Sequence, residues 1–192
     1  MNLSYPLILA SNSPRRKEIL ANAGFNFKVE TLSVNEDFPE NLDHQKVAEF
    51  LAEKKGSAYP EVFKNHIIIT ADTTVVTNSE ILNKPENEEK AYKMLRSLSG
   101  NTHQVITGVC IISPSKKVTF SESTKVFFGV ISDQEIQHYI TNYRPFDKAG
   151  AYGIQEWIGM IGIDRIEGSF YNVMGLPIRK IYKTLSDQFS ES

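Results

Sequence analysis

The 192-residue chain is 41% hydrophobic and 23% charged, values typical of a globular domain with a hydrophobic core. Its net charge of −2 argues against a general nucleic-acid binder, and no apolar run approaches the roughly 20 residues needed to cross a bilayer. The first residues, MNLSYPLILAS, lack a basic region and a long apolar run, so we expect no signal peptide and a cytoplasmic protein. The single cysteine, Cys110, is expected to be a buried strand thiol.

Strands and helices alternate along the first half of the chain. Ser13 as N-cap and Pro14 as first helical residue predict a short helix that Gly24 ends. Asp43 is expected to cap a longer helix, and the acidic segment 35–42 before it reads as a loop. The elements expected here are a strand over 5–11, a helix from Ser13, a strand over 25–32, a helix over 43–59 and a buried strand over 66–77.

The second half continues the alternation and adds a hairpin. Ser132 and Glu135 form a capping box, which predicts the start of a helix. The elements expected here are a helix over 86–100, strands over 103–113 and 117–130, a helix over 132–141, a strand over 151–162 and a helix from about 176 to 189. Because a hairpin and helix-separated strands occur together, the sequence predicts the α/β class with a mixed sheet.

Several common catalytic motifs do not occur in the sequence. It contains no Walker-type loop, no G-x-G-x-x-G, no H-E-x-x-H and no G-x-S-x-G. The four histidines, at 44, 66, 103 and 138, lack the spacing of metal ligands, and His103 is expected to be structural. A Ser–His or Cys–His nucleophile therefore has no support.

Three cations lie in the first turn of the helix that starts at Ser13. Arg15, Arg16 and Lys17 stand at the end of the helix whose dipole is already positive, where acidic residues are preferred. The penalty is a few tenths of a kcal/mol per charge, so a plain solvated face is one interpretation. The other is an anion held by guanidinium groups and free backbone N–H groups.

Carboxylates and lysines in other segments favour the second interpretation. Asp72 lies within an apolar strand, where an unpaired carboxylate is costly; it is either satisfied structurally, a metal ligand or a general base. Glu36 lies in a loop, Lys84 precedes a proline, and Asp147 and Lys148 adjoin a small-residue turn. Carboxylates for a divalent cation and basic groups for polyanionic oxygens are the components of phosphoryl-group chemistry.

Eight segments, spread in order along nearly the whole chain, carry a family resemblance: LASNSPRRKEIL, NE at 35–36, LAEKK, ADTTV, NKP, LSGNTHQVITG, DKAGAYGIQ and GSFYNVMGLP. Together they resemble the Maf (septum formation inhibitor-like) family of nucleoside triphosphate pyrophosphatases. The resemblance implies one domain over 1–192, an elongated α/β fold with a mixed, curved sheet and two lobes around a central cleft. That fold is similar to the fold of inosine triphosphate pyrophosphatases.

The family hydrolyses nucleoside triphosphates to monophosphate and pyrophosphate with a divalent metal, Mg²⁺ or Mn²⁺ being expected here. The resemblance makes Asp72 the proton acceptor, a metal ligand or both, and places Glu36 on the metal side. The phosphate-contacting positions that it implies are Ser11, Arg15, Arg16, Lys55 and Lys84.

Arg15, Thr73 and Gln155 match the specificity positions of the branch that prefers dTTP and UTP. A glutamine amide offers a donor and an acceptor to the O4 and N3–H edge of thymine or uracil, although it can equally pair with adenine. Arg144 departs from the family, in which many relatives carry an acid at that position. The family implies a homodimer, and the charge balance and short apolar runs lead us to expect no membrane and no stable nucleic-acid partner. The alternative is a non-catalytic nucleotide-binding regulator of cell division.

Overall fold

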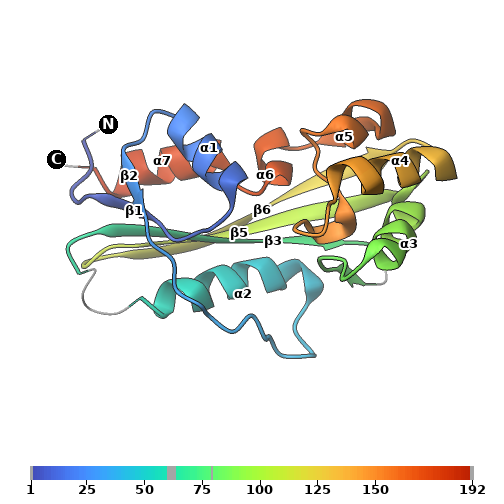
Figure 1. Cartoon of the computed structure of the whole chain (residues 1–192). Coiled ribbons are helices and arrows are strands. Elements are labelled where there is room, and N and C mark those ends of the chain that lie inside the picture. The colour runs from blue at the N-terminus through green and yellow to red at the C-terminus, as the bar shows by residue number, and fades with distance from the viewer. Residues whose placement is uncertain (1, 60–63, 79, 191–192) are drawn as a thin grey trace. The chain divides into compact units, whose positions relative to one another are not determined.

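The computed structural model describes residues 2–59, 64–78 and 80–190 (Figure 1). In chain order its elements are β1 (Leu7–Leu9), α1 (Pro14–Asn22), β2 (Phe27–Val29), α2 (His44–Ser57), β3 (Ile67–Val76), β4 (Ile81–Leu82), α3 (Glu88–Leu98), β5 (Thr102–Ile112), β6 (Lys117–Phe128), α4 (Asp133–Tyr143), the 3-10 turn η2 (Ala149–Ala151), α5 (Trp157–Gly162), β7 (Ile163–Glu167), α6 (Phe170–Met174) and α7 (Ile178–Gln188). Within these described ranges, no helix is long and apolar enough to span a membrane.

The strands of the described residues form one mixed sheet, which confirms the predicted α/β class. Its order is β2-β1-β3-β5-β6-β7, with the short β4 paired to β3. β1 pairs in parallel with both β2 and β3, whereas β3 with β4 and β6 with β7 are antiparallel. The predicted hairpin is β5 and β6, joined by a turn in which the Ser113 N–H donates to the Lys116 carbonyl at 2.8 Å.

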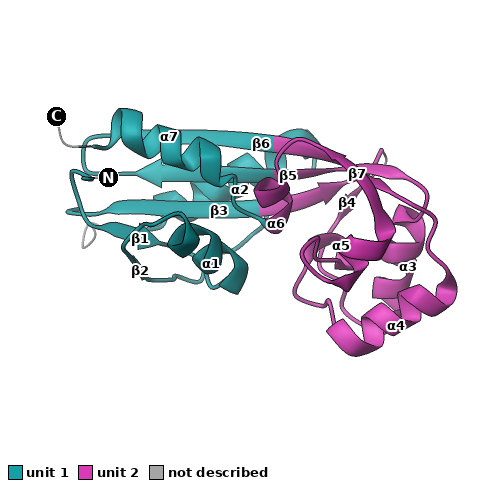
Figure 2. Ribbon diagram, turned by 90° about the horizontal axis from the view of Figure 1, so that it is seen from above, with its two compact units in different colours: residues 1–72, 107–122, 175–192 teal, residues 73–106, 123–174 magenta. Residues whose placement is uncertain are grey.

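The chain divides into two compact units, each made of separate stretches of sequence (Figure 2). Unit 1 contains residues 1–72, 107–122 and 175–192, and unit 2 contains residues 73–106 and 123–174. Asp72 and Thr73 are neighbours in sequence but belong to different units, because β3 passes from one to the other between them.

In unit 1, α1 and α7 lie on one side of the strands and α2 lies on the other (Figure 1). α1 begins as the sequence predicts: the Ser13 side chain accepts a hydrogen bond from the Arg16 N–H, and Pro14 is the first helical residue. At its end Gly24 has a φ of 81°, a left-handed conformation that suits glycine. The strands β1 and β3 bury continuous apolar runs, which is typical of parallel strands covered on both faces.

Helix α2 packs directly on the sheet of unit 1 because small residues line the contact. A Cβ atom at Gly108 of β5 would lie 2.2 Å from the Ala48 carbonyl oxygen of α2, so only glycine fits there. One turn before the end of α2, the buried Thr70 hydroxyl donates to the Ala52 carbonyl at 2.6 Å. These contacts fix the end of α2 that carries Lys55.

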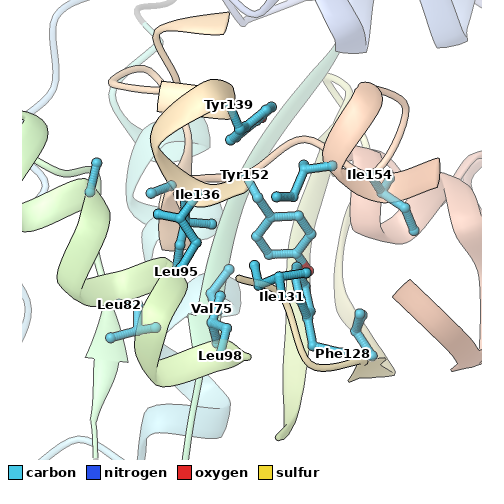
Figure 3. Close-up of a cluster of buried hydrophobic side chains, with 14 of the residues drawn as sticks. Val75, Leu82, Leu95, Leu98, Phe128, Ile131, Ile136, Tyr139, Tyr152 and Ile154 are labelled. Carbon is cyan, nitrogen blue, oxygen red and sulfur yellow. The ribbon is translucent and has the colours of Figure 1, made fainter. Parts of the chain in front are cut away.

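Unit 2 has its own apolar core (Figure 3). Figure 3 shows the Tyr152 ring among buried side chains contributed by the helices and strands around it. The labelled members are Val75, Leu82, Leu95, Leu98, Phe128, Ile131, Ile136, Tyr139, Tyr152 and Ile154. The segment around residue 152 is therefore anchored in the core.

The prediction of a strand over 151–162 is wrong. The segment starts at Ala151, the last residue of η2, continues through a turn and ends as helix α5. Its aromatic and β-branched residues suggested a strand, but Ile158 and Gly162 are buried four residues apart, as one face of a helix requires. A Cβ at Gly159 would lie 1.8 Å from the Ile154 carbonyl oxygen, so glycine allows the chain to fold back on itself here.

Other boundaries differ less. The strand predicted over 25–32 forms regular pairing only over Phe27–Val29, and the short β4, β7 and α6 are additions to the prediction. Cys110 is buried in β5 as expected. Arg144, the departure from the family pattern, ends α4 in a left-handed conformation with a φ of 46°, and its guanidinium lies 5.8 Å from the centre of the Phe146 ring.

Candidate functional site in unit 1

The guanidinium of Arg16 joins three separate segments of unit 1. Its Nε donates to the Gly175 carbonyl at 2.8 Å, and its Nη1 donates to the Ala71 carbonyl at 2.8 Å and to the Ser11 hydroxyl at 3.3 Å. The Ser11 hydroxyl also accepts the Ser13 N–H at 3.2 Å. These bonds place the first turn of α1 beside the residue that precedes Asp72.

This geometry explains part of the unusual charge at the start of α1. Arg16 does not lie on a solvated face, because its side chain turns toward β3 and bonds to carbonyl oxygens there. Arg15, the neighbouring predicted site residue, is partly buried in the same turn. Arg16 therefore has a structural role, connecting α1, β3 and the segment before α7, besides any contact with a phosphate.

Lys55 brings two of the predicted carboxylates together. Its Nζ lies 2.5 Å from Asp72 Oδ1 and 2.8 Å from Glu36 Oε1. The side chains of Lys55 and Asp72 are 18% and 14% exposed, whereas that of Glu36 is 56% exposed, so the loop acid reaches this pair from the solvent side. The ammonium group of Lys55 thus acts as a single cation shared by two carboxylates.

The charges of this cluster act on one another. Burial lowers the pKa of Arg16, the negative charge of Asp72 raises it, and the positive charge of Arg15 lowers it again. Glu36 makes a further contribution that raises the pKa of Arg16. Since an arginine side chain keeps its proton under all ordinary conditions, Arg16 remains a cation next to these acids. Electrostatic interactions within unit 1 thus connect five of the predicted site residues, namely Arg15, Arg16, Glu36, Lys55 and Asp72. Ser11 joins them through its hydrogen bond with Arg16.

Three predicted site residues belong to unit 2. Thr73 is partly buried in β3, and Lys84 is exposed just after β4. Gln155 is exposed between the buried Ile154 and the start of α5. Within unit 2, the Asn83 carbonyl beside Lys84 accepts the Gly150 N–H at 3.3 Å, which links the loop of Lys84 to the loop that leads to Gln155.

The donor set of unit 1 suits a hard divalent cation. Glu36 and Asp72 both direct an oxygen at Lys55 Nζ, so the two carboxylates already converge on one positive charge. Mg²⁺ is commonly held by one or two carboxylates together with phosphate oxygens and water. Within the described parts of the chain, no group of three or more His, Cys, Asp or Glu side chains is arranged for a metal.

His103, which was expected to be structural, has a hydrogen-bond partner at one ring nitrogen, whereas its buried Nδ1 has none among the described residues. It is buried in unit 2, and its Nε2 lies 2.7 Å from the Tyr152 hydroxyl. Burial lowers the pKa of His103 to about 4, so the imidazole is neutral at pH 7.

A comparison with models of protein families shows which family the chain belongs to. A model described as Maf-like protein matches residues 6–188. This chain belongs to the Maf-like protein family. The family resemblance read from the sequence is thereby confirmed.

Maf-like proteins named "dTTP/UTP pyrophosphatase" are among its relatives. That of Porphyromonas gingivalis is 50% identical over 98% of this chain and 96% of the relative. Those of Parabacteroides distasonis and Cytophaga hutchinsonii are both 48% identical, over 94% and 96% of this chain and 95% and 84% of the relatives, respectively.

Sequence reasoning named the charged residues of this Maf-like protein but missed their partners. The Arg16 bonds end on the backbone carbonyls of Ala71 and Gly175, which carry no side-chain signal. Gly175 has a φ of 110°, so its glycine was a usable signal that the backbone there has a special conformation. Lys148 is buried in unit 2 against Glu156 and Asp147, and the sequence did not indicate these partners.

Proposed function

We propose that this Maf-like protein hydrolyses dTTP and UTP to the nucleoside monophosphate and pyrophosphate. The observation that carries the proposal is the Lys55 ammonium between Asp72 and Glu36, with the Arg16 guanidinium bonded to the carbonyl of the residue before Asp72. This arrangement supplies carboxylates and fixed cations in one place, as cleavage of a phosphoanhydride requires. The names of relatives at 48–50% identity support the choice of substrates.

In the proposed reaction a water molecule attacks the α-phosphorus. Its oxygen forms a new bond to that phosphorus, the bond from the α-phosphorus to the bridging oxygen breaks, and pyrophosphate leaves with the bond's electron pair. Asp72 accepts the proton of the water, and Lys55 orients the Asp72 carboxylate through the 2.5 Å contact. Arg15, Arg16 and Lys84 offset the negative charge of the phosphates and the leaving group.

Glu36 and Asp72 are the residues that would hold a divalent cation, Mg²⁺ or Mn²⁺. Both already share a cation in Lys55, and the remaining ligands of such a metal are typically water and substrate phosphate. When bound, the metal neutralises phosphate charge. In the same proposal Asp72 orients the water, and Lys55 adds to the positive charge that offsets the charge of the phosphates.

Gln155 is proposed to read the base, with Thr73 and Arg15 contributing to selectivity. Its exposed amide can donate to O4 of thymine or uracil and accept from N3–H. Cytosine reverses this pattern, with an amino group in place of O4 and no N3–H, so dCTP pairs only when the amide is turned by 180°. An amide held in one orientation therefore discriminates against dCTP, because the same contact leaves polar groups unpaired.

A panel of ordinary and modified nucleoside triphosphates tests the proposal, with pyrophosphate and monophosphate both measured at several Mg²⁺ and Mn²⁺ concentrations. We expect stoichiometric pyrophosphate and monophosphate from dTTP and UTP. Release of inorganic phosphate together with the nucleoside diphosphate would instead show that water attacks the γ-phosphorus. Tight nucleotide binding without any hydrolysis would instead support the regulator that the sequence left as the alternative.

A further inference from the structure

The loop that leads to Gln155 is held by a buried polar network in unit 2. The Lys148 side chain is 8% exposed, and its Nζ lies 3.1 Å from Glu156 Oε1 and 2.7 Å from Asp147 Oδ1. The other oxygen of Glu156, Oε2, accepts a short hydrogen bond from the hydroxyl of Tyr139, a fully buried residue of α4. The network therefore ties residues at both ends of the loop 147–156 to α4.

Gly153 connects the backbone of the loop to the same network. Its N–H donates to the Tyr139 hydroxyl at 3.0 Å, so the phenol oxygen accepts from the loop while its proton goes to Glu156. A Cβ at Gly153 would lie 2.9 Å from Glu156 Cδ and 3.1 Å from Lys148 Cε, so the loop passes close against the network. Burial and the Glu156 carboxylate raise the pKa of Tyr139, which keeps its hydroxyl protonated as a donor.

Gln155 lies next to Glu156 and is exposed, although its neighbours Tyr152, Gly153 and Ile154 are buried. The direction of the Gln155 side chain thus depends on a backbone that is fixed two residues earlier at Gly153 and one residue later at Glu156. We infer that Tyr139, Lys148 and Glu156 are positioning residues that set the orientation of Gln155 and thereby the choice of base. This inference rests on the proposed function, because it assigns base reading to Gln155.

Stability alone does not account for such a network. Burying a lysine and a glutamate costs desolvation energy, and well-packed apolar residues often give equal or better stability at such positions. A network of this kind fixes one geometry when each of its members has a partner, as all three do here. A small error in the position of a binding group is enough to reduce discrimination between substrates.

Tyr139→Phe tests the inference, because it removes the hydroxyl that serves both Gly153 and Glu156 and keeps the ring. We expect the ratio of kcat/KM for dTTP to that for dCTP to fall about tenfold, mainly through a higher KM for dTTP, with kcat at saturation little changed. Tyr143→Phe is the matched control, since Tyr143 lies on the same helix, stacks on Tyr139 and is 38% exposed. It is expected to leave the ratio unchanged.

A double-mutant cycle with Gln155→Ala separates positioning from general weakening of the fold. If the network acts through Gln155, the double variant Tyr139→Phe/Gln155→Ala has the dTTP:dCTP ratio of Gln155→Ala alone. Additive losses, or an unchanged ratio in Tyr139→Phe accompanied only by a lower thermal midpoint, would overturn the inference. An unchanged dTTP:dCTP ratio in Gln155→Ala itself would also overturn the inference.

Glu156→Gln serves the same purpose if Tyr139→Phe does not fold. It keeps an oxygen that accepts from Tyr139 and loses the ion pair with Lys148, so the ratio is again expected to fall. A wild-type protein that hydrolyses neither dTTP nor UTP would refute the proposed function itself. A wild type that hydrolyses both, with unchanged selectivity in the variants, would refute only the positioning role.

Discussion

The two units hold their polar groups in opposite ways. In unit 1, Lys55 and Asp72 form a partly exposed cluster that the still more exposed Glu36 completes. In unit 2, Tyr139 and Lys148 are buried and Glu156 is mostly so, while the amide of Gln155 beside them is exposed. Unit 1 presents its charges directly, whereas in unit 2 buried charged groups lie beside an exposed neutral side chain, which we propose they hold in place.

This difference matches two kinds of chemical task. Cleavage of a phosphoanhydride needs charged groups near the phosphates, and such groups must remain able to exchange partners when a ligand arrives. Base recognition needs a neutral donor and acceptor in a fixed direction, for which a rigid support is more useful than charge. Variants in the two units should therefore differ in kind: loss of turnover for one and loss of selectivity or stability for the other.

Asp72→Asn is expected to have the largest effect on activity. It removes the proposed proton acceptor and one of two carboxylates, so kcat should fall by about 100-fold or more. The free energy of unfolding should change little, because Asn has nearly the same volume and Lys55 keeps its contact with Glu36. Steady-state pyrophosphate release and urea unfolding measure the two quantities.

Glu53→Gln is the matched control for that substitution. Glu53 lies on α2 and pairs with Lys117 within unit 1, so the change also removes one carboxylate from a lysine pair. Its kcat should stay within about twofold of the wild type, since exposed ion pairs contribute little to stability and this one is not part of the proposed site. An Asp72→Asn variant with near wild-type turnover would exclude Asp72 as the base.

Local signals in the sequence were sufficient for much of this fold. Ser13–Pro14 and the Ser132–Glu135 capping box give the starts of α1 and α4 within a residue, because caps satisfy backbone groups of their own helix. The apolar run of β3 was equally clear. Helix α5 was missed since its residues favour strands, and only packing against the rest of unit 2 makes it helical.

The candidate site was predictable as a set of residues but not as a geometry. Asp72 was identified because a carboxylate within an apolar strand is costly unless it is paired or functional. Arg16 was identified because cations are unfavourable in the first turn of a helix. That Lys55 lies between Asp72 and Glu36 depends on how α2 packs on the sheet, which no local pattern encodes. The partner of Lys148 could not be predicted for the same reason, because Glu156 comes near it only after the loop folds back.

Gly108→Ala tests whether the scaffold of unit 1 sets the position of Lys55. The new Cβ would lie 2.2 Å from the Ala48 carbonyl oxygen and 2.4 Å from the Glu49 nitrogen, both backbone atoms that cannot move aside independently. We expect a loss of about 1–3 kcal/mol in the free energy of unfolding, the usual cost of overpacking, together with lower activity as α2 moves. Urea unfolding and pyrophosphate release measure both effects.

Gly162→Ala in unit 2 provides the contrast for that substitution. There the nearest atoms are side-chain carbons, Ile131 Cγ2 at 3.2 Å and Phe128 Cε1 at 3.5 Å, which can adjust by small rotations. Its effect on the free energy of unfolding should remain below about 1 kcal/mol. Equal losses for the two glycine variants would contradict the close helix–sheet contact at Gly108.

The smallest expected effect is a pH dependence of stability that originates in unit 2. Burial lowers the pKa of His103 from its ordinary value of 6.5 to about 4 in the folded protein. Between these values the unfolded chain binds a proton that the folded protein does not, so folding loses stability as the pH falls from 6.5 toward 4. For this one group the loss amounts to about 1 kcal/mol between pH 7 and pH 5.5.

His103→Gln should reduce that slope by the same amount, because glutamine does not titrate and still offers an acceptor to the Tyr152 hydroxyl. Urea unfolding at pH 7.0, 6.3 and 5.5 measures the slope. His138→Gln is the control, since it replaces an exposed histidine of the same unit. If both variants keep the wild-type slope, His103 does not gain a proton preferentially on unfolding, and folding does not lower its pKa.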